Sequence, residues 1–170
     1  MAVRYSPQEL EIWLVDGKDG VEFQPYQNLP HVKVVSLQSA PELSRSILSE
    51  LDGEKERRNS IFNQVGVSDF IAYRQQEQPL GNLPRIILIV DEYQELFIDD
   101  KEGEASQALL ELASQGRSTG IHLLLGSQRQ LIYILDRLLD RLKFTQYSAR
   151  PTLEDVRYYQ IYSIRVMASS

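Results

Sequence analysis

Two apolar runs constrain the fold of this chain more than any other feature of its sequence. Residues 86–90 and 121–125 are apolar at nearly every position, with almost no alternation between apolar and polar side chains. Short runs of this kind are typical of strands in parallel sheets, which helices cover on both faces. A third run, residues 10–15, ends at Asp16. The sequence therefore predicts three strands of a parallel sheet.

Helical patterns fill the intervals between these runs. The expected helices are residues 40–64 with Pro41 in the first turn, 68–75 with Ser68 as N-cap, 103–115 with Gly116 as the stop, and 130–143. In the first of them, Gly53 weakens the middle, and the charged stretch 54–58 is expected to be exposed. A last strand is expected within residues 158–166. Alternating strands and helices predict an α/β fold, a mostly parallel sheet with flanking helices and right-handed crossovers.

The composition is that of an ordinary globular domain and argues against several functions. The 170 residues suit one domain, cysteine is absent, and two histidines do not favour a histidine-built metal site. No membrane-length apolar run or signal-peptide pattern occurs, so we expect a cytoplasmic protein. The net charge of −6 argues against DNA binding by bulk charge alone. The nearest candidate for a local basic surface that could contact DNA consists of Arg137, Arg141 and Lys143. Because Asp136 and Asp140 are interleaved with them, this segment is more simply a solvated helix face.

Each apolar run ends in polar or small residues. In open α/β sheets, ligands bind at the carboxyl ends of the strands. Any chemistry is therefore expected at Asp16, Asp91, Glu92, Ser127 and Gln128.

Residues 86–92 have the form of a Walker B segment, a buried strand followed by Asp-Glu. A rigidly held Asp91 can bind Mg²⁺ through water, and Glu92 can orient and deprotonate an attacking water. Gln128 can sense a γ-phosphate, since its amide both donates and accepts hydrogen bonds. The alternative is that acidic residues merely follow a strand before a helix start, and that Gln128 belongs to a polar loop.

Several spaced segments, taken in order, resemble the motor domain of the FtsK/SpoIIIE family. The clearest are residues 83–96, which resemble its Walker B stretch, and residues 109–129, which resemble the helix, turn and strand end that follow. Shorter resemblances occur at residues 13–18, 26–31, 54–58 and 66–73. We therefore interpret residues 1–170 as a single partial motor domain, family-like over 10–129, with a divergent C-terminal helix and a possible last strand in 130–170.

The resemblance implies a RecA-like motor that uses ATP and Mg²⁺ and moves double-stranded DNA, or a relative in secretion or defence systems. It implies Asp91 as the Mg²⁺ residue, Glu92 as the activator of water and Gln128 as the γ-phosphate sensor. Ser127 is expected beside the nucleotide, and Arg117 near a subunit boundary as a trans-acting candidate. The expected partners are DNA in the intact motor and either further copies of the chain or a complete translocase subunit.

The sequence departs from the family pattern in its phosphate-binding loop. No Gly-x-x-x-x-Gly-Lys-[Ser/Thr] motif occurs in the 170 residues. ATP hydrolysis is therefore expected only if a longer chain or a partner supplies that loop. The alternatives are a non-catalytic scaffold for a complete translocase or secretion ATPase, and a decayed gene product without activity. An incomplete RecA-like sheet, without the P-loop strand, would expose an edge beside residues 121–125, to be covered by residues 158–166 or by another chain.

Three further residues have structural interpretations. Trp13 is expected in the core rather than as a base-stacking platform. His122, inside an apolar strand, is expected to be a hydrogen-bonded structural residue. Asp16 and Lys18 are expected to form a local ion pair at the strand end.

Overall fold

The computed structural model describes residues 2–17, 23–36, 41–98, 100, 103–127, 145–148 and 160–163. The elements in chain order are β1 (Leu10–Asp16), the 3-10 helix η1 (Gln24–Tyr26), β2 (Val32–Ser36), α1 (Pro41–Val65), α2 (Phe70–Gln75), β3 (Arg85–Asp91), the 3-10 helix η2 (Tyr93–Phe97), α3 (Glu104–Thr119), β4 (Ile121–Ser127), β5 (Thr145–Ser148) and β6 (Gln160–Ser163).

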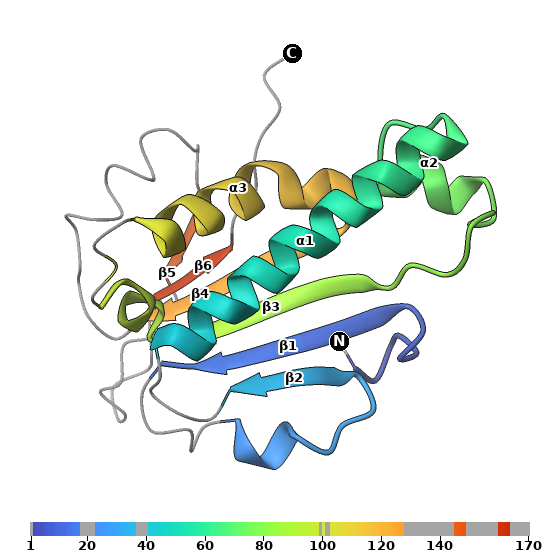
Figure 1. The fold of residues 1–170 in the computed structure, drawn as a ribbon. Helices are drawn as coiled ribbons and strands as arrows, with labels where there is room; N and C mark the ends of the chain where they lie inside the picture. Colours follow the sequence, from blue (N-terminus) through green and yellow to red (C-terminus); the bar gives the residue numbers. More distant parts are fainter. Residues whose placement is uncertain are drawn as a thin grey trace.

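The strands form one sheet in the order β2-β1-β3-β4-β6-β5 (Figure 1). The first four strands are parallel to their neighbours, so the three apolar runs are confirmed as adjacent parallel strands. The sequence analysis missed β2, a short strand beside β1 that contains a lysine and lacks a clear apolar run. The α/β fold with a mostly parallel sheet is confirmed.

The edge beside β4 is covered by the chain's own β6. This strand pairs antiparallel with β4, with Gly126 opposite Ile161, and β5 pairs antiparallel with β6. The expectation that part of residues 158–166 covers this edge is therefore confirmed for residues 160–163. In the described part of the chain, this pairing covers the edge of β4 from Leu124 to Ser127.

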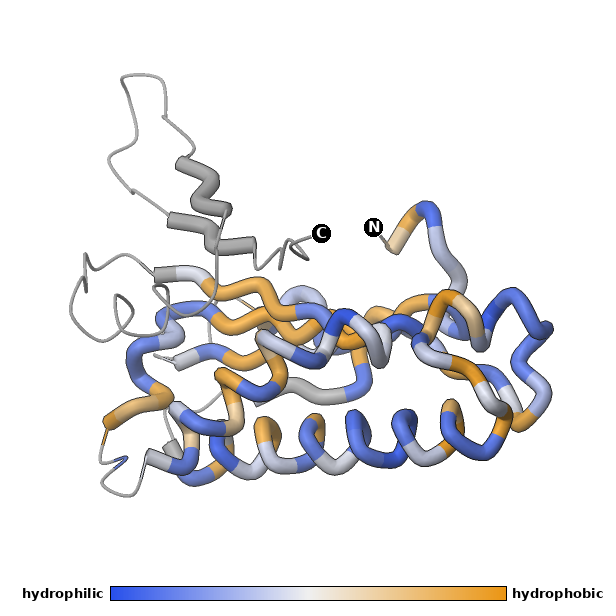
Figure 2. Tube along the Cα trace, turned by 90° about the horizontal axis from the view of Figure 1, so that it is seen from above, coloured by the Kyte–Doolittle hydropathy of each residue, from blue (hydrophilic) through white to orange (hydrophobic). Residues whose placement is uncertain are grey.

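Helices α1 and α3 pack on one face of the sheet, and Figure 2 shows α1 lying along that side. Alternate residues of β3 point into this interface, and Ile86, Leu88 and Val90 are buried there. They form one core with the α1 and α3 residues Ile47, Leu48, Leu51, Leu109 and Leu112. On the other face the intervening residues of β3 are half-buried, while Leu10, Leu14 and Asp16 of β1 are buried. The expectation that helices cover both faces stays a prediction for this second face.

Two expected helix boundaries were wrong. The N-cap of α2 is Asp69, which accepts a hydrogen bond from Ala72 N at 2.8 Å, and Ser68 lies one residue outside. Helix α3 continues through Gly116 to Thr119, and the residue that caps its end is Gly120, whose φ of 79° favours glycine. Gly116 is needed for packing instead, because a Cβ there would lie 2.8 Å from the backbone oxygen of Ile121. The helix expected at residues 130–143 lies outside the described residues.

The charged stretch 54–58 is not uniformly exposed, contrary to expectation. Lys55 is 2% exposed and Arg58 is fully buried. Both follow Leu51 at helical spacing, four and seven residues later, so they lie on the face of α1 that packs inward. The Lys55 ammonium lies 2.7 Å from the Asp52 carboxylate and 3.7 Å from that of Glu111 on α3. Charge alone did not indicate which residues of this stretch face the core.

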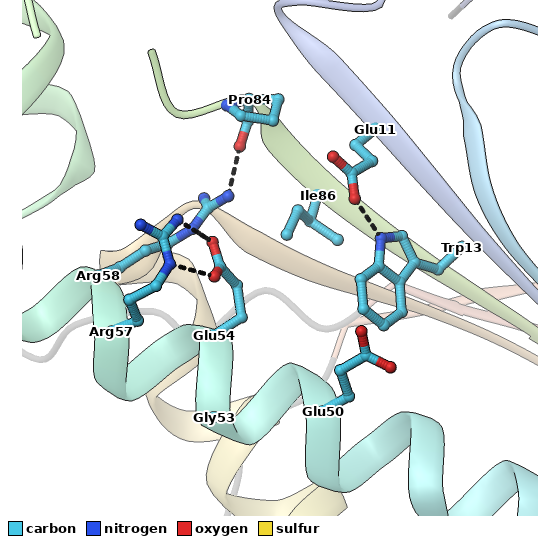
Figure 3. Close-up of a pocket in the computed structure, with 9 residues that line it drawn as sticks. All are labelled: Glu11, Trp13, Glu50, Gly53, Glu54, Arg57, Arg58, Pro84 and Ile86. Carbon is cyan, nitrogen blue, oxygen red and sulfur yellow. Dashed lines mark hydrogen bonds and ion pairs between the residues drawn. The ribbon is translucent and has the colours of Figure 1, made fainter. Parts of the chain in front are cut away.

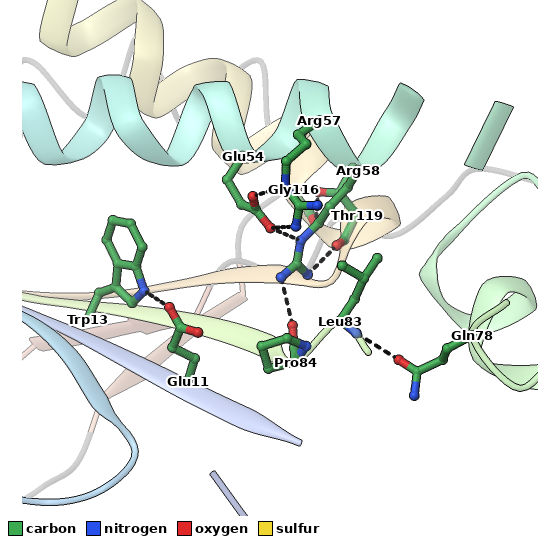
Figure 4. A network of polar contacts seen from close by, with 10 residues as sticks. All are labelled: Glu11, Trp13, Glu54, Arg57, Arg58, Gln78, Leu83, Pro84, Gly116 and Thr119. Carbon is green, nitrogen blue, oxygen red and sulfur yellow. Dashed lines mark hydrogen bonds and ion pairs between the residues drawn. The ribbon is translucent and has the colours of Figure 1, made fainter. Parts of the chain in front are cut away.

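Arg58 links three elements through its guanidinium (Figure 4). Its Nε donates to Glu54 Oε1 at 2.7 Å, within α1. Its Nη1 donates to the carbonyl of Thr119 at 2.9 Å, and its Nη2 donates to the carbonyl of Pro84 at 2.8 Å. Thr119 is the last residue of α3 and Pro84 directly precedes β3. The buried charge therefore satisfies a helix end and holds α1 against the start of β3.

We expect Gly53→Ala to stabilise the chain by about 0.5–1 kcal/mol. Gly53 lies in the uninterrupted helix α1, and a Cβ there meets nothing within 4 Å. Urea denaturation measures the change. The matched control is Gly120→Ala, which should destabilise, because its Cβ would lie 2.6 Å from the Phe70 ring. An unchanged or lowered stability for Gly53→Ala would contradict the prediction.

Candidate functional site

The carboxyl ends of β1 and β3 meet at one edge of the sheet. Asp16 lies opposite Asp91 in the parallel register, and the backbone N–H of Gly17 donates to the carbonyl of Asp91 at 3.0 Å. Asp16 is 2% exposed and Asp91 is half-buried. Residues opposite each other in a sheet point to the same face. The two acidic residues expected to cluster are thus brought together, on the face opposite α1 and α3.

Glycines on both neighbouring strands allow the chain to approach Asp91 closely. A Cβ at Gly17 would lie 2.7 Å from the carbonyl oxygen of Glu92 and 3.0 Å from that of Asp91. A Cβ at Gly126 would lie 3.2 Å from Asp91 Oδ1. The missing side chain of Gly126 leaves space beside the Asp91 carboxylate, whereas that of Gly17 lets the chain pass close to the backbone of Asp91 and Glu92. The sequence analysis assigned no role to these glycines, although each directly follows or lies within a predicted strand end.

Glu92 has an unusual backbone conformation for a residue other than glycine. Its φ of 51° and ψ of 50° are left-handed, and the residue is 4% exposed. Such a conformation costs on the order of 1–3 kcal/mol and concentrates at functional sites. It turns the chain from β3 into η2, where the buried Tyr93 and Leu96 anchor the turn in the core.

The Glu92 carboxylate is oriented by Gln94, whose Nε2 donates to Glu92 Oε2. Gln94 is buried, at 9% exposed. A buried carboxylate that accepts a hydrogen bond from an amide is held in one direction. Gln94 was not among the predicted site residues. The available signal was a polar side chain two positions after the acidic pair, inside an otherwise apolar turn.

The third strand end lies at the same edge. Val90 lies opposite Leu125, and β4 ends at Ser127, which pairs with Gln160 of β6. The backbone of Ser127 is therefore close to the Asp91 end of the sheet. Gln128 and Lys18 lie outside the described residues. The sensor role of Gln128, the nucleotide contact of Ser127 and the Asp16–Lys18 ion pair stay predictions.

Arg117 lies at the opposite end of the strands from Asp91, near the amino end of β4. It occupies the last turn of α3, which leads into the amino end of β4, and it is exposed. It is near enough to His122 to lower the pKa of that residue. The structure therefore does not bring Arg117 together with Asp91 and Glu92. The trans-acting role expected of Arg117 stays a prediction.

His122 and Trp13 have the structural surroundings expected of them. Arg85 Nη1 lies 3.2 Å from His122 Nε2, and burial, followed by the charges of Arg85 and Arg117, lowers the pKa of His122 to about 4. His122 is therefore neutral at pH 7, with Nε2 as the acceptor. Trp13 is 5% exposed in the core, and its indole N–H donates to Glu11 at 2.7 Å.

A cavity of about 330 Å³ lies between α1 and the amino ends of β1 and β3 (Figure 3). Trp13, Pro84 and Ile86 line it together with charged residues of α1. Within it, Arg57 donates to Glu54 at 2.6 and 2.8 Å, and Arg58 donates to the same carboxylate. These paired charges explain its polar wall as part of the α1 attachment. The cavity is remote from the Asp91 edge.

The donor set at the Asp91 edge suits a hydrated Mg²⁺ better than a protein-enclosed metal. Among the residues that the structure describes, no group of three or more histidine or acidic side chains could hold a metal ion. Mg²⁺ typically takes one or two carboxylates and completes its shell with water and phosphate oxygens. The half-buried Asp91, with glycines beside it, fits that role. No helix in the described ranges is long and apolar enough to cross a membrane.

A mostly parallel α/β sheet with a strand that ends in a half-buried Asp and a buried Glu is typical of P-loop-type nucleotide-binding domains. The FtsK/SpoIIIE family profile matches residues 1–131, and the chain belongs to this family. The resemblance seen in the sequence is thereby confirmed.

The chain is similar to much longer relatives. It is 28% identical over 149 residues to the ESX secretion system protein EccC of Geobacillus thermodenitrificans, covering 85% of this chain and 10% of the relative. It is 27% identical over 145 residues to the DNA translocase FtsK of Streptococcus pyogenes, covering 81% and 18%. The cytoplasmic domain of the Thermomonospora curvata type VII secretion ATPase EccC superimposes with a TM-score of 0.70 at 31% identity, covering 82% and 17%. The chain thus spans a tenth to a fifth of these proteins.

Proposed function

We propose that this chain is the metal-holding and water-activating part of an ATP-driven motor domain. The observation that carries the proposal is the strand end at Asp91 and Glu92. Asp91 is half-buried with Gly126 of β4 beside its carboxylate, and Glu92 is buried in a left-handed turn with its carboxylate held by Gln94. Membership of the FtsK/SpoIIIE family supports ATP and Mg²⁺ as the cofactors.

The proposed roles follow from where the side chains lie. Bound Mg²⁺ and ATP would supply the phosphoryl group and neutralise its charge. Asp91 would hold the hydrated metal, and Glu92 would accept a proton from the attacking water, kept in position by Gln94. Ser127 and Gln128 would contact the nucleotide from the end of β4.

The chain needs a phosphate-binding loop from elsewhere to complete this site. The 170 residues contain no such motif, and the relatives are several times longer. We propose that a longer polypeptide or a neighbouring subunit supplies the loop, in an oligomer that works in the cytoplasm. Arg117, at the opposite end of the strands, would then face a neighbouring subunit.

The polymer moved by such a motor is a protein or DNA. Secretion is favoured by the ESX relatives and by the 31% identity to the type VII secretion ATPase. The net charge of −6 also agrees with a protein substrate, because DNA binding relies on basic surface. DNA translocation, the activity expected from the sequence, is the second candidate and is supported by the similarity to FtsK.

The test is Mg²⁺-dependent ATP hydrolysis by the native polypeptide that contains this segment, with Asp91→Asn beside the wild type. We expect Asp91→Asn to raise the Mg²⁺ concentration needed for half-maximal hydrolysis by about 10- to 100-fold, because the metal loses its protein carboxylate. Glu50→Asn, on the exposed side of α1, is the control and should leave the requirement unchanged.

An unchanged Mg²⁺ requirement for Asp91→Asn would refute the assignment of Asp91. A native polypeptide that folds but binds no ATP at millimolar concentration would refute the motor itself. That second result would leave the interaction scaffold as the function of the chain.

A further inference from the structure

A larger cavity, of about 690 Å³, lies at the amino ends of β1, β3 and β4. In the register of these strands Leu10 lies opposite Arg85 and Ile87 lies opposite His122, and all four residues line the cavity on the face opposite α1 and α3. The Asp91 site lies at the other end of the same face. The volume is within the usual range for small-molecule sites. Neither the proposed motor chemistry nor the core packing uses this cavity.

Positive charge dominates the cavity wall. Arg4, Arg74 and Arg85 line it, and among the described residues Glu9 is the one carboxylate that does so. Glu9 already accepts two hydrogen bonds from Ser6, and its other oxygen lies 4.0 Å from Arg74. Because the chain has a net charge of −6, a local excess of guanidinium groups is unusual in it.

Two of the guanidinium groups that line the cavity also contact one aromatic ring, that of Phe70. Arg85 lies 5.1 Å and Arg74 lies 5.8 Å from the centre of the Phe70 ring. Arg85 also donates to the neutral His122, which adds no negative charge. Like charges gathered around one recess repel each other, and an anion bound between them relieves that repulsion. The arrangement is therefore suited to a ligand that brings negative charge.

We propose that this cavity binds the phosphate group of a small organic phosphate. Guanidinium groups recognise phosphate through parallel hydrogen bonds, and a phosphate dianion matches three arginines against one glutamate better than a single carboxylate does. The apolar floor of Leu10 and Ile87 would contact the organic part of the ligand. A duplex DNA backbone fits less well, because the positive charge lines a recess rather than an extended surface.

The test is a calorimetric titration of the chain with phenyl phosphate in the absence of Mg²⁺ and ATP. We expect saturable binding that is weakened about tenfold by Arg85→Gln, because a half-buried guanidinium contact to phosphate is lost. Arg4→Gln, in an exposed segment where folding is not at risk, should weaken binding severalfold. Arg57→Gln, an exposed arginine of α1 paired with Glu54, removes the same charge and should bind as the wild type does.

Two ligand controls test the chemistry. Benzoate keeps the ring but carries a single charge, and it should bind about tenfold more weakly than phenyl phosphate. A duplex DNA oligonucleotide should not displace phenyl phosphate. Absence of saturable binding at millimolar phenyl phosphate, equal binding by Arg4→Gln and the wild type, equal binding of benzoate, or displacement by DNA would each overturn the proposal.

The proposal stands independently of the motor function. The cavity and Asp91 lie at opposite ends of the strands, so Asp91→Asn should retain phenyl phosphate binding in full. Loss of binding in Asp91→Asn would mean that the phosphate binds at the Asp91 site, and it would overturn the proposal of a separate phosphate-binding cavity. Failure of the ATP hydrolysis test has no bearing on the titration.

Discussion

Replacing Arg58 with alanine is expected to lower the free energy of unfolding by about 3–5 kcal/mol. The guanidinium is fully buried and donates to Glu54, to the Thr119 carbonyl and to the Pro84 carbonyl. Alanine would leave both carbonyls without this donor, at the end of α3 and before β3. It would also leave the Glu54 carboxylate with less compensation and open a cavity under α1. Urea denaturation followed by circular dichroism measures the loss.

Arg57 provides the matched control for this prediction. It is the neighbouring arginine and pairs with the same Glu54, but its side chain is 53% exposed. Arg57→Ala should cost at most about 1 kcal/mol, because exposed ion pairs contribute little. Similar losses for the two variants would mean that the Arg58 contacts do not hold α1 to the sheet.

Glu92→Gln is expected to reduce the rate of ATP hydrolysis by the native polypeptide by about 10²–10⁴-fold. The amide keeps the size and can keep a hydrogen bond with Gln94, but it cannot accept a proton from water. Since Asp91 is unchanged, ATP binding in the presence of Mg²⁺ should be retained. Steady-state hydrolysis and an equilibrium binding measurement together separate the two effects.

The comparison with Gln94→Leu sharpens this test. Leucine removes the amide that orients the Glu92 carboxylate but leaves the carboxylate itself. Its effect on hydrolysis should be smaller than that of Glu92→Gln, about 10-fold. A Glu92→Gln variant that hydrolyses ATP at the wild-type rate would remove Glu92 from the mechanism. A Gln94→Leu variant with the larger defect would indicate that turn stability, rather than proton transfer, explains the loss.

The helix ends show which structural features local sequence signals can predict and which they cannot. Pro41 was correctly expected in the first turn of α1, because its fixed φ suits that position. Gly116 was expected to end α3, yet the helix continues for three residues to Thr119. A glycine can serve either as a stop or as a place of close packing, and the neighbouring Ile121 backbone decides which. Sequence spacing does not contain that information.

The sequence by itself determined the helices α1, α2 and α3, the parallel pairing of β1, β3 and β4, and the meeting of Asp16 with Asp91. These follow from apolar runs and from the rule that crossovers bring carboxyl ends to one edge. Only the tertiary structure decided that Arg58 is buried, that Glu92 is left-handed and that Arg74 and Arg85 converge on Phe70. Each of those depends on contacts between distant segments, and a charged or acidic residue looks the same in sequence whether it faces water or a neighbouring helix.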